Sequence, residues 1–171
     1  MLSPFFRSLF ILAFIGSLLF AGDFEEGLKA AQKQDFATAH RLWLKAAEQG
    51  DARAQNNLGL MYKYGDGALQ DYAKAMSWCR KSAKQGYAEA QSDLAMMYEN
   101  GDGVAKNLVI AHALLRLAAA SGDQNYKDTR DLLGKKLSSN QSDQSKTLAQ
   151  EPQKLWALID AKQNPQSKKK K

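Results

Sequence analysis

The chain has 171 residues, 44% of them hydrophobic and 25% charged, a composition typical of one folded domain. Its formal net charge is +6, but four of these charges come from Lys168, Lys169, Lys170 and Lys171 and one from Arg7, which leaves +1 for the rest. A nearly neutral body argues against a nucleic-acid-binding protein, which needs a basic face along its length. The single cysteine, Cys79, excludes an intramolecular disulfide.

Residues 1–22 are predicted to be a secretory signal peptide. Arg7 precedes an uncharged, mostly apolar run from Ser8 to Ala21. A helix of that length spans about 21 Å, less than the hydrocarbon core of about 30 Å, so cleavage near Ala21 or Gly22 is favoured. An uncleaved membrane anchor is the alternative, because Leu19 stands where a smaller residue normally precedes the cut. No lipid anchor is expected, since this segment has no cysteine.

Residues 23–51 are predicted to form a short first unit of two helices. Asp23 can cap the first helix, and an apolar stripe from Phe36 to Ala47 marks the second, which Gly50 closes. The loop between these helices is about four residues shorter than in the units that follow. This unit is therefore expected to be an N-terminal cap.

Residues 52–123 contain one pattern twice, in units 52–87 and 88–123. The two copies share 13 identical residues over 36 aligned positions, where ordinary composition would give roughly two or three. A fixed period in this range indicates a solenoid built from one supersecondary unit. Within each unit, apolar residues recur at helical spacing on either side of a Gly-Asp-Gly turn. Positive φ angles are expected at the turn glycines, namely Gly65, Gly67, Gly101 and Gly103.

The repeated residues resemble the Sel-one-like repeat family, a relative of the tetratricopeptide repeat. The residues that carry the resemblance are Ala54, Leu58-Gly59, Tyr62, Gly65-Asp66-Gly67, Lys74-Ala75, Trp78, Ala83 and Gly86. The second copy departs from the family pattern at Ala95, Ile110 and Leu114. The resemblance implies an all-α fold, a right-handed α-solenoid of stacked two-helix repeats, and a scaffold that holds protein partners. Some secreted members carry a cysteine pair in each unit, which this chain lacks.

The repeat domain is expected to span residues 23–160, with 124–160 as a C-terminal cap. A helix is predicted from Tyr126 to Leu137, packing through Leu132, Leu133 and Leu137. Ser138-Ser139 should begin a polar helix that ends before Pro152, and a last apolar turn or two should follow from Leu155 to Ile159. That turn either covers the open end of the solenoid or binds a partner. Residues 161–171 read as a disordered, polybasic tail.

Catalytic and metal chemistry are not indicated by the spacing of polar residues. His40 and His112 occupy the same repeat position two units apart, which places them too far from each other to share a metal, and each is expected to be a packing residue. The Gly-Asp-Gly turns follow a helix and lack the lysine of a phosphate-binding loop. No serine or cysteine has a base beside it in the periodic pattern. No cofactor is expected.

The partner-binding surface is predicted on the first helix of each full unit. The residues off its packing stripe are Arg53, Asn56, Leu60 and Lys63 in one unit and Glu89, Ser92, Met96 and Glu99 in the next. Exposed Leu60 and Met96 would serve as apolar anchors for a bound peptide, and the charges would orient it. The alternative is that Arg53 pairs with Glu89, and Lys63 with Glu99, as ordinary surface ion pairs.

The sequence therefore predicts an exported, non-enzymatic repeat scaffold that mediates protein–protein interaction in the periplasm, elsewhere in the cell envelope or outside the cell. Two alternatives remain: a hydrolase acting on envelope polymers or β-lactams, and a polyanion or membrane-surface binder. The second would act through loose attraction of Lys168 to Lys171 to an anionic surface.

Overall fold

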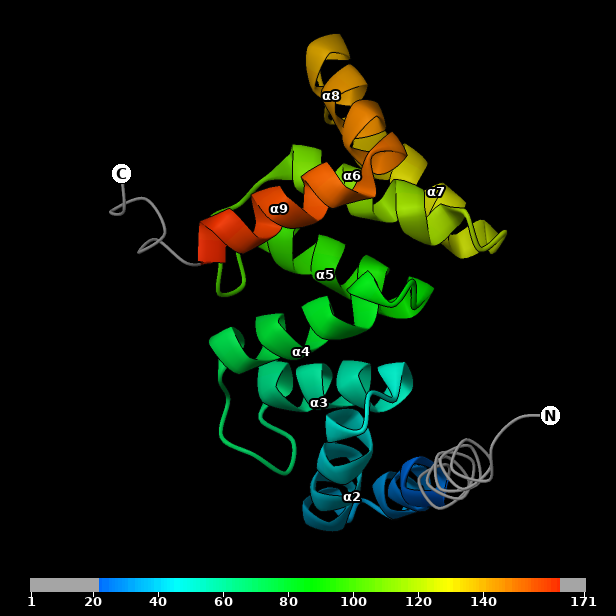
Figure 1. The fold of residues 1–171 in the computed structure, drawn as a ribbon, viewed down its shortest axis with the longest axis vertical. Helices are drawn as coiled ribbons and strands as arrows, with labels where there is room; N and C mark the ends of the chain where they lie inside the picture. The colour runs from blue at the N-terminus through cyan, green and yellow to red at the C-terminus, as the bar shows by residue number, and fades with distance from the viewer. Residues whose placement is uncertain (1–21, 164–171) are drawn as a thin grey trace, which may run out of the picture. The chain divides into compact units, whose positions relative to one another are not determined.

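The computed structural model describes residues 22–163, and this part of the chain consists of helices joined by turns and loops (Figure 1). The first described helix covers residues 22–32. The helices that follow are α2 (Phe36–Glu48), α3 (Ala52–Tyr64), α4 (Tyr72–Lys84), α5 (Ala88–Asn100), α6 (Leu108–Ala119), α7 (Gln124–Gly134), α8 (Ser139–Gln150) and α9 (Pro152–Gln163). The fold is all-α and built from repeated helix pairs, as the periodicity predicts. The predicted signal peptide lies outside the described residues except for Gly22.

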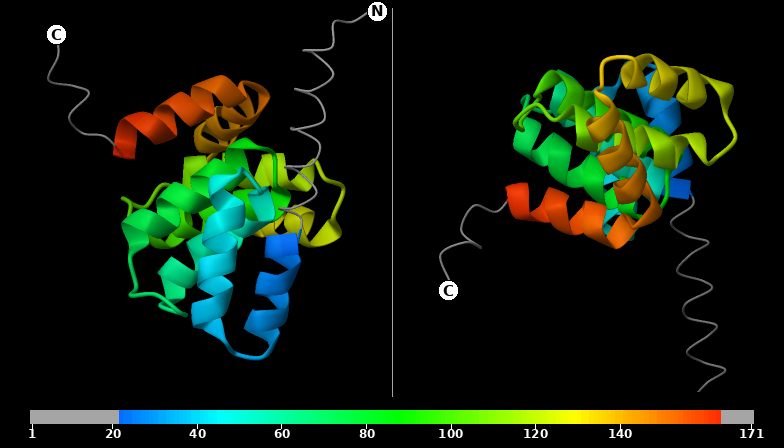
Figure 2. Two further views of the ribbon diagram at one scale, coloured as in Figure 1. Left: turned by 60° about the horizontal axis from the view of Figure 1, so that its bottom comes forward. Right: turned by 90° about the horizontal axis from the view of Figure 1, so that it is seen from above.

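The chain forms two compact units, which divide within α4 between Ala75 and Met76. In the first unit, the helix over residues 22–32 and α2 form a hairpin (Figure 2, left, blue and cyan). Phe24 stacks on Trp43 with ring centroids 6.3 Å apart, and Trp43 Nε1 donates a hydrogen bond to the Phe24 carbonyl. A Cβ at Gly27 would lie 2.5 Å from Trp43 Nε1. Glycine at position 27 therefore lets the indole pack against this helix.

The Gly-Asp-Gly turns of repeats 52–87 and 88–123 have the same backbone conformation. Gly65, Gly67, Gly101 and Gly103 all have positive φ angles, from 71° to 89°. The turns end with matching main-chain hydrogen bonds of 2.8 Å, from Asp71 to the Tyr62 carbonyl and from Asn107 to the Tyr98 carbonyl. A Cβ at Gly67 would lie 2.4 Å from the carbonyl oxygen of Phe36. Position 67 thus requires glycine for close approach as well as for its φ angle.

Side-chain hydrogen bonds fix where the helices begin and how successive units join. Asp51 accepts hydrogen bonds from the amides of Arg53 and Ala54, which starts α3. The next helix of the same kind, α5, has no such side-chain cap. A feature that both helices share is a glutamine bonded to the preceding helix. Gln55 donates to the Ala47 carbonyl at 3.0 Å, and Gln91 donates to the Ala83 carbonyl at 3.2 Å. The period of the sequence is therefore also a period of hydrogen bonds.

In the second unit, α6 is the central helix, packed against α5, α7 and α8. It is apolar on most of its circumference, as expected for a helix enclosed on several sides. Its fully buried side chains include Ile110, Leu114 and Leu115, and Leu94 and Met97 of the neighbouring α5 are also fully buried. After α8 the chain turns into α9 (Figure 2, right, orange and red). Leu155 and Ile159 of α9 are fully buried.

Two boundaries and one helix cap differ from the sequence prediction. The helix expected to run to Leu137 ends at Gly134, and the last three residues form a tight turn because Ser138 caps α8 through a capping box with Gln141. Helix α9 continues through Gln163, so the tail predicted from Ala161 starts inside a helix. Asp23 pairs with Lys45 at 2.9 Å from within the first helix, so its predicted role as a helix cap is wrong.

Candidate functional site

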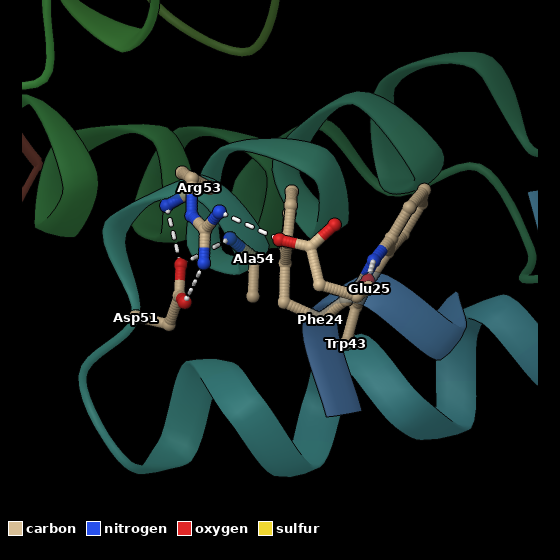
Figure 3. A network of polar contacts seen from close by, with 6 residues as sticks. All are labelled: Phe24, Glu25, Trp43, Asp51, Arg53 and Ala54. Carbon is tan, nitrogen blue, oxygen red and sulfur yellow. Dashed lines mark hydrogen bonds and ion pairs between the residues drawn. The ribbon is translucent and has the colours of Figure 1, made fainter. Parts of the chain in front are cut away.

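Arg53, the first predicted partner-binding residue, is engaged in contacts within the first unit (Figure 3). Its guanidinium lies 3.9 Å from the centre of the Phe24 ring and forms ion pairs of 3.0 Å with Asp51 and Glu25. Hydrogen bonding to Asp51 raises the pKa of Arg53 above its usual value. Burial alone would raise the pKa of Asp51, but the hydrogen bonds from Arg53 and the Ala54 amide outweigh burial and lower this pKa. Arg53 thus connects the start of α3 to the first helix.

Two further predicted residues of α3 do not line an open surface. Asn56 is fully buried and Lys63 is 8% exposed, so their assignment to an open groove is wrong. The physical reason is that α3 is buried around much of its circumference, and the prediction allowed it only one buried stripe. Leu60 is half-buried, between the buried Gly59 and Met61.

The four predicted residues of the second unit lie on one stripe of α5. Glu89 and Met96 are exposed, and Ser92 and Glu99 are half-buried. Met96 is 37% exposed, a large fraction for an apolar side chain in a helix that buries Leu94 and Met97 completely. Glu99 forms an ion pair of 2.7 Å with Lys136. Glu99 therefore has an ion-pair partner that the sequence did not predict.

An open hollow of about 230 Å³ lies beside Glu99, between α5 and α7. Its lining residues are Glu99, Asp128, Thr129, Leu132, Leu133 and Lys136. Leu133 is 2% exposed and forms an apolar floor, whereas Leu132 is 64% exposed at the edge. The predicted burial of Leu133 is confirmed, whereas the prediction that Leu132 packs on the last full unit is wrong, because its side chain is exposed. The hollow thus offers an apolar interior with charged groups around it.

Sequence reasoning missed the contribution of α7, although the repeat contained the signal. Met96 lies one period of 36 residues after Leu60, and Leu132 lies one period after Met96. The same step from Ser92 gives Asp128, another lining residue. The identities fade after residue 123, which concealed the register. An apolar residue therefore recurs at one helix position in three successive 36-residue periods. It is exposed at Met96 and Leu132, which both lie in the second compact unit.

Two carboxylates line this hollow, Glu99 of α5 and Asp128 of α7. Two more lie on α5 nearer its start, the exposed Glu89 and the half-buried Asp93. Burial raises the pKa of Tyr126, and the nearby charges of Glu89, Asp123 and Asp93 raise it further. These carboxylates of α5 and of the α7 cap therefore lie near the phenol of Tyr126. Lys136 is the cation among the lining residues, and Glu99 pairs with it.

A serine and a histidine meet in the second unit, away from this hollow. Ser145 Oγ lies 2.7 Å from His112 Nδ1 and 2.7 Å from the Ser142 carbonyl oxygen. The periodic pattern did not predict this contact, because it joins α6 of the repeat to α8, which follows the repeat. Ser145 is fully buried and His112 is 3% exposed. A substrate carbonyl cannot reach this hydroxyl, so the pair holds α8 on α6 rather than forming a nucleophile.

His40 takes a different partner in the first unit. Its Nε2 lies 3.1 Å from the Tyr62 hydroxyl, and the two rings meet edge to face with centroids 5.4 Å apart. Burial, followed by the charge of Lys74, lowers the pKa of His40. Within residues 22–163, no group of three or more His, Cys, Asp or Glu side chains is placed to hold a metal ion. Nor is any helix in this range both long and apolar enough to cross a membrane.

Comparison with known families and structures gives a consistent result. The model of the Sel1 repeat matches residues 16–51, 52–87 and 88–123. The chain is similar to c5321, a protective antigen of uropathogenic Escherichia coli strains with an SLR fold, with a TM-score of 0.74 and 28% identity over 82% of this chain and 32% of that one. It is also similar to a Sel1 repeat protein from Oxalobacter formigenes, with a TM-score of 0.53 and 38% identity over 56% of this chain and 40% of that one. This chain thus spans less than half the length of either protein. No curated protein sequence matches it.

Proposed function

Because the chain belongs to the Sel1 repeat family, whose repeats generally mediate protein–protein interaction, we propose that it is an exported, non-enzymatic scaffold that binds a protein partner. Matches to three successive repeats and two similar repeat structures support the general role. The export step and the particular binding surface are the more specific parts of the proposal.

The observation that carries the binding surface is the recurring apolar position. Leu60, Met96 and Leu132 are one period apart, and the last two are 37% and 64% exposed. An exposed Leu or Met buries little apolar surface within the chain, so a repeated apolar side chain beside an apolar hollow is explained by a partner that covers it. The surface proposed here comprises Met96 and Ser92 of α5 with Leu132 of α7, bordered by Glu89, Glu99 and Asp128.

Export is supported by the sequence of residues 1–22, a short apolar run after Arg7 that is too brief to span a bilayer easily. The mature protein would then act in the periplasm or outside the cell. N-terminal sequencing of the protein from its native host tests this step, and a mature chain starting near Gly22 or Asp23 is expected. Intact Met1 in a membrane fraction would instead show an uncleaved anchor.

Affinity capture from the envelope fraction of the native host tests the binding surface. The tagged chain should retain a specific partner, and the double variant Met96→Ser with Leu132→Ser should lose it. Because both side chains are exposed, this variant should keep the melting temperature of the parent protein. The matched control is Leu69→Ser, which removes a 91% exposed leucine from the loop before α4. Equal capture by all three proteins would show that the partner binds elsewhere.

A further inference from the structure

We propose that the hollow between α5 and α7 binds a basic peptide segment of the partner, in which an apolar side chain enters the hollow and flanking lysines or arginines meet the carboxylates around it. This inference rests on the proposed function and specifies the chemistry of the partner.

The apolar requirement follows from the floor and size of the hollow. Leu133 forms the floor and exposed Leu132 one edge, while Met96 lies one turn before Glu99 on α5. The volume of about 230 Å³ is below the range of small-molecule pockets, which starts at about 300 Å³. A hollow of this kind suits one apolar side chain of a peptide better than a cofactor.

The basic requirement follows from the acidic side chains of α5 and from Asp128, which lines the hollow. Helix α5 carries the carboxylates of Glu89, Asp93 and Glu99 and no basic residue. Helix α7 carries two carboxylates and two basic residues, and its Asp128 lines the hollow. Lys136 opposes them from the lining, and it is already paired with Glu99 at 2.7 Å. A peptide carrying positive charge would be attracted and oriented by this field, and an acidic peptide would be repelled.

The chain's own polybasic end is a weaker match for the same surface. Residues 164–171 supply four lysines but no apolar side chain other than the ring of Pro165. They would satisfy the carboxylates and leave Leu132 and Leu133 uncovered. The proposal therefore commits to a segment of another protein with both features, and the experiment includes the chain's own end as a competitor.

Lys136 allows the proposal to be tested by a gain as well as a loss of binding. Its pair with Glu99 is exposed and contributes little to stability, but its charge lies where a basic partner would bind. Removing Lys136 should therefore strengthen binding of a basic peptide, whereas removing a bordering carboxylate should weaken it. A surface with a merely structural ion pair would respond to neither change.

Fluorescence anisotropy with the full-length chain and three labelled peptides tests these points. The first peptide has a central leucine flanked on each side by two lysines, the second replaces the leucine with serine, and the third replaces the lysines with glutamates. We expect the first to bind about tenfold or more tighter than either of the others and to lose affinity with added salt. Equal binding of the leucine and serine peptides, or binding of the glutamate peptide, would overturn the proposal.

Variants locate the binding. Asp128→Lys should weaken binding of the leucine–lysine peptide by about tenfold, and Lys136→Ala should strengthen it by about threefold. The control Asp143→Lys makes the same change of charge at an exposed site on α8 and should leave affinity unchanged. Equal effects of Asp128→Lys and Asp143→Lys would show attraction by net charge alone and would refute the assignment.

A chain ending at Ser167 shows whether the lysine tail occupies the hollow. Affinity unchanged by this truncation supports a partner segment as the occupant, whereas a tenfold gain would show that the tail fills the site. Failure of all three peptides to bind, with capture of the partner still lost in the Met96→Ser and Leu132→Ser variant, would refute the basic chemistry and leave the proposed function intact.

Discussion

The imidazole of His112 and the hydroxyl of Ser145 are 33 residues apart in sequence and 2.7 Å apart in the folded chain. His112 belongs to the repeat and Ser145 to α8, which follows it. Both side chains are buried, and Gly134 of α7 leaves room for the ring, since a Cβ there would lie 3.2 Å from His112 Nε2. One histidine thus connects the last repeat to the helices that cover it.

Removing the Ser145 hydroxyl should destabilise the protein by about 1–3 kcal/mol, because Ser145→Ala leaves the buried Nδ1 of His112 without its partner. Urea unfolding followed by circular dichroism measures the change. The matched control is Ser142→Ala, since Ser142 contributes its main-chain carbonyl to this cluster and keeps it in the variant. An equal loss in both variants would mean that helix propensity, not the His112 contact, sets the effect.

Stability should fall as the pH drops below the usual histidine pKa of 6.5. Burial, followed by the charges of Arg116 and Arg130, lowers the pKa of His112 in the folded state. The folded protein then binds fewer protons than the unfolded chain, so protonation favours unfolding and stability rises with pH through the interval just below 6.5. The melting temperature measured from pH 7.5 to 5 should decrease.

His40 contributes in the same direction, because burial and Lys74 lower its pKa as well. Its replacement in His40→Gln should therefore reduce the pH dependence, and the double variant with His112→Gln should remove most of it. A pH profile unchanged in the double variant would assign the dependence to other groups.

The two glycines of the first Gly-Asp-Gly turn, Gly65 and Gly67, should differ in their tolerance of a side chain. Both have positive φ angles, so alanine costs about 1–2 kcal/mol at either position from backbone strain. At Gly65 the nearest atom to a new Cβ is 3.6 Å away, an ordinary contact, whereas at Gly67 it is the Phe36 carbonyl oxygen at 2.4 Å. We expect Gly67→Ala to be clearly more destabilising than Gly65→Ala in thermal unfolding. The reverse order would contradict the contact between this turn and α2.

Sequence periodicity predicted the helix pairs and their core because each repeat position meets a similar environment. Leu58 and Leu94 share one position and both are fully buried. It failed for Asn56 and Lys63, since a hydrophobic stripe shows which face is apolar but not how many faces neighbouring helices cover. The hollow beside Leu132 could not be predicted from periodicity, because it depends on the positions of α5 and α7 relative to each other. That arrangement depends on packing over many residues and has no local signature.

Two equivalent tyrosines differ in hydrogen bonding, because the same hydroxyl has a partner in one repeat and lacks one in the next. The Tyr62 hydroxyl lies 3.1 Å from His40 Nε2. One period later, the Tyr98 hydroxyl is buried without a hydrogen-bond partner among the described residues, and Met76 occupies the repeat position of His40. A thioether is at best a weak acceptor, and burial raises the pKa of Tyr98 to about 12.

The two tyrosines should therefore respond differently to loss of the hydroxyl. Tyr62→Phe should lower the free energy of unfolding by about 0.5–1.5 kcal/mol, the usual worth of one hydrogen bond. Tyr98→Phe should leave it unchanged or raise it, because the variant removes a buried polar group that gains nothing in return. Urea unfolding of both variants beside the parent protein measures the difference. A loss in Tyr98→Phe as large as in Tyr62→Phe would show that the Tyr98 hydroxyl binds an internal water molecule.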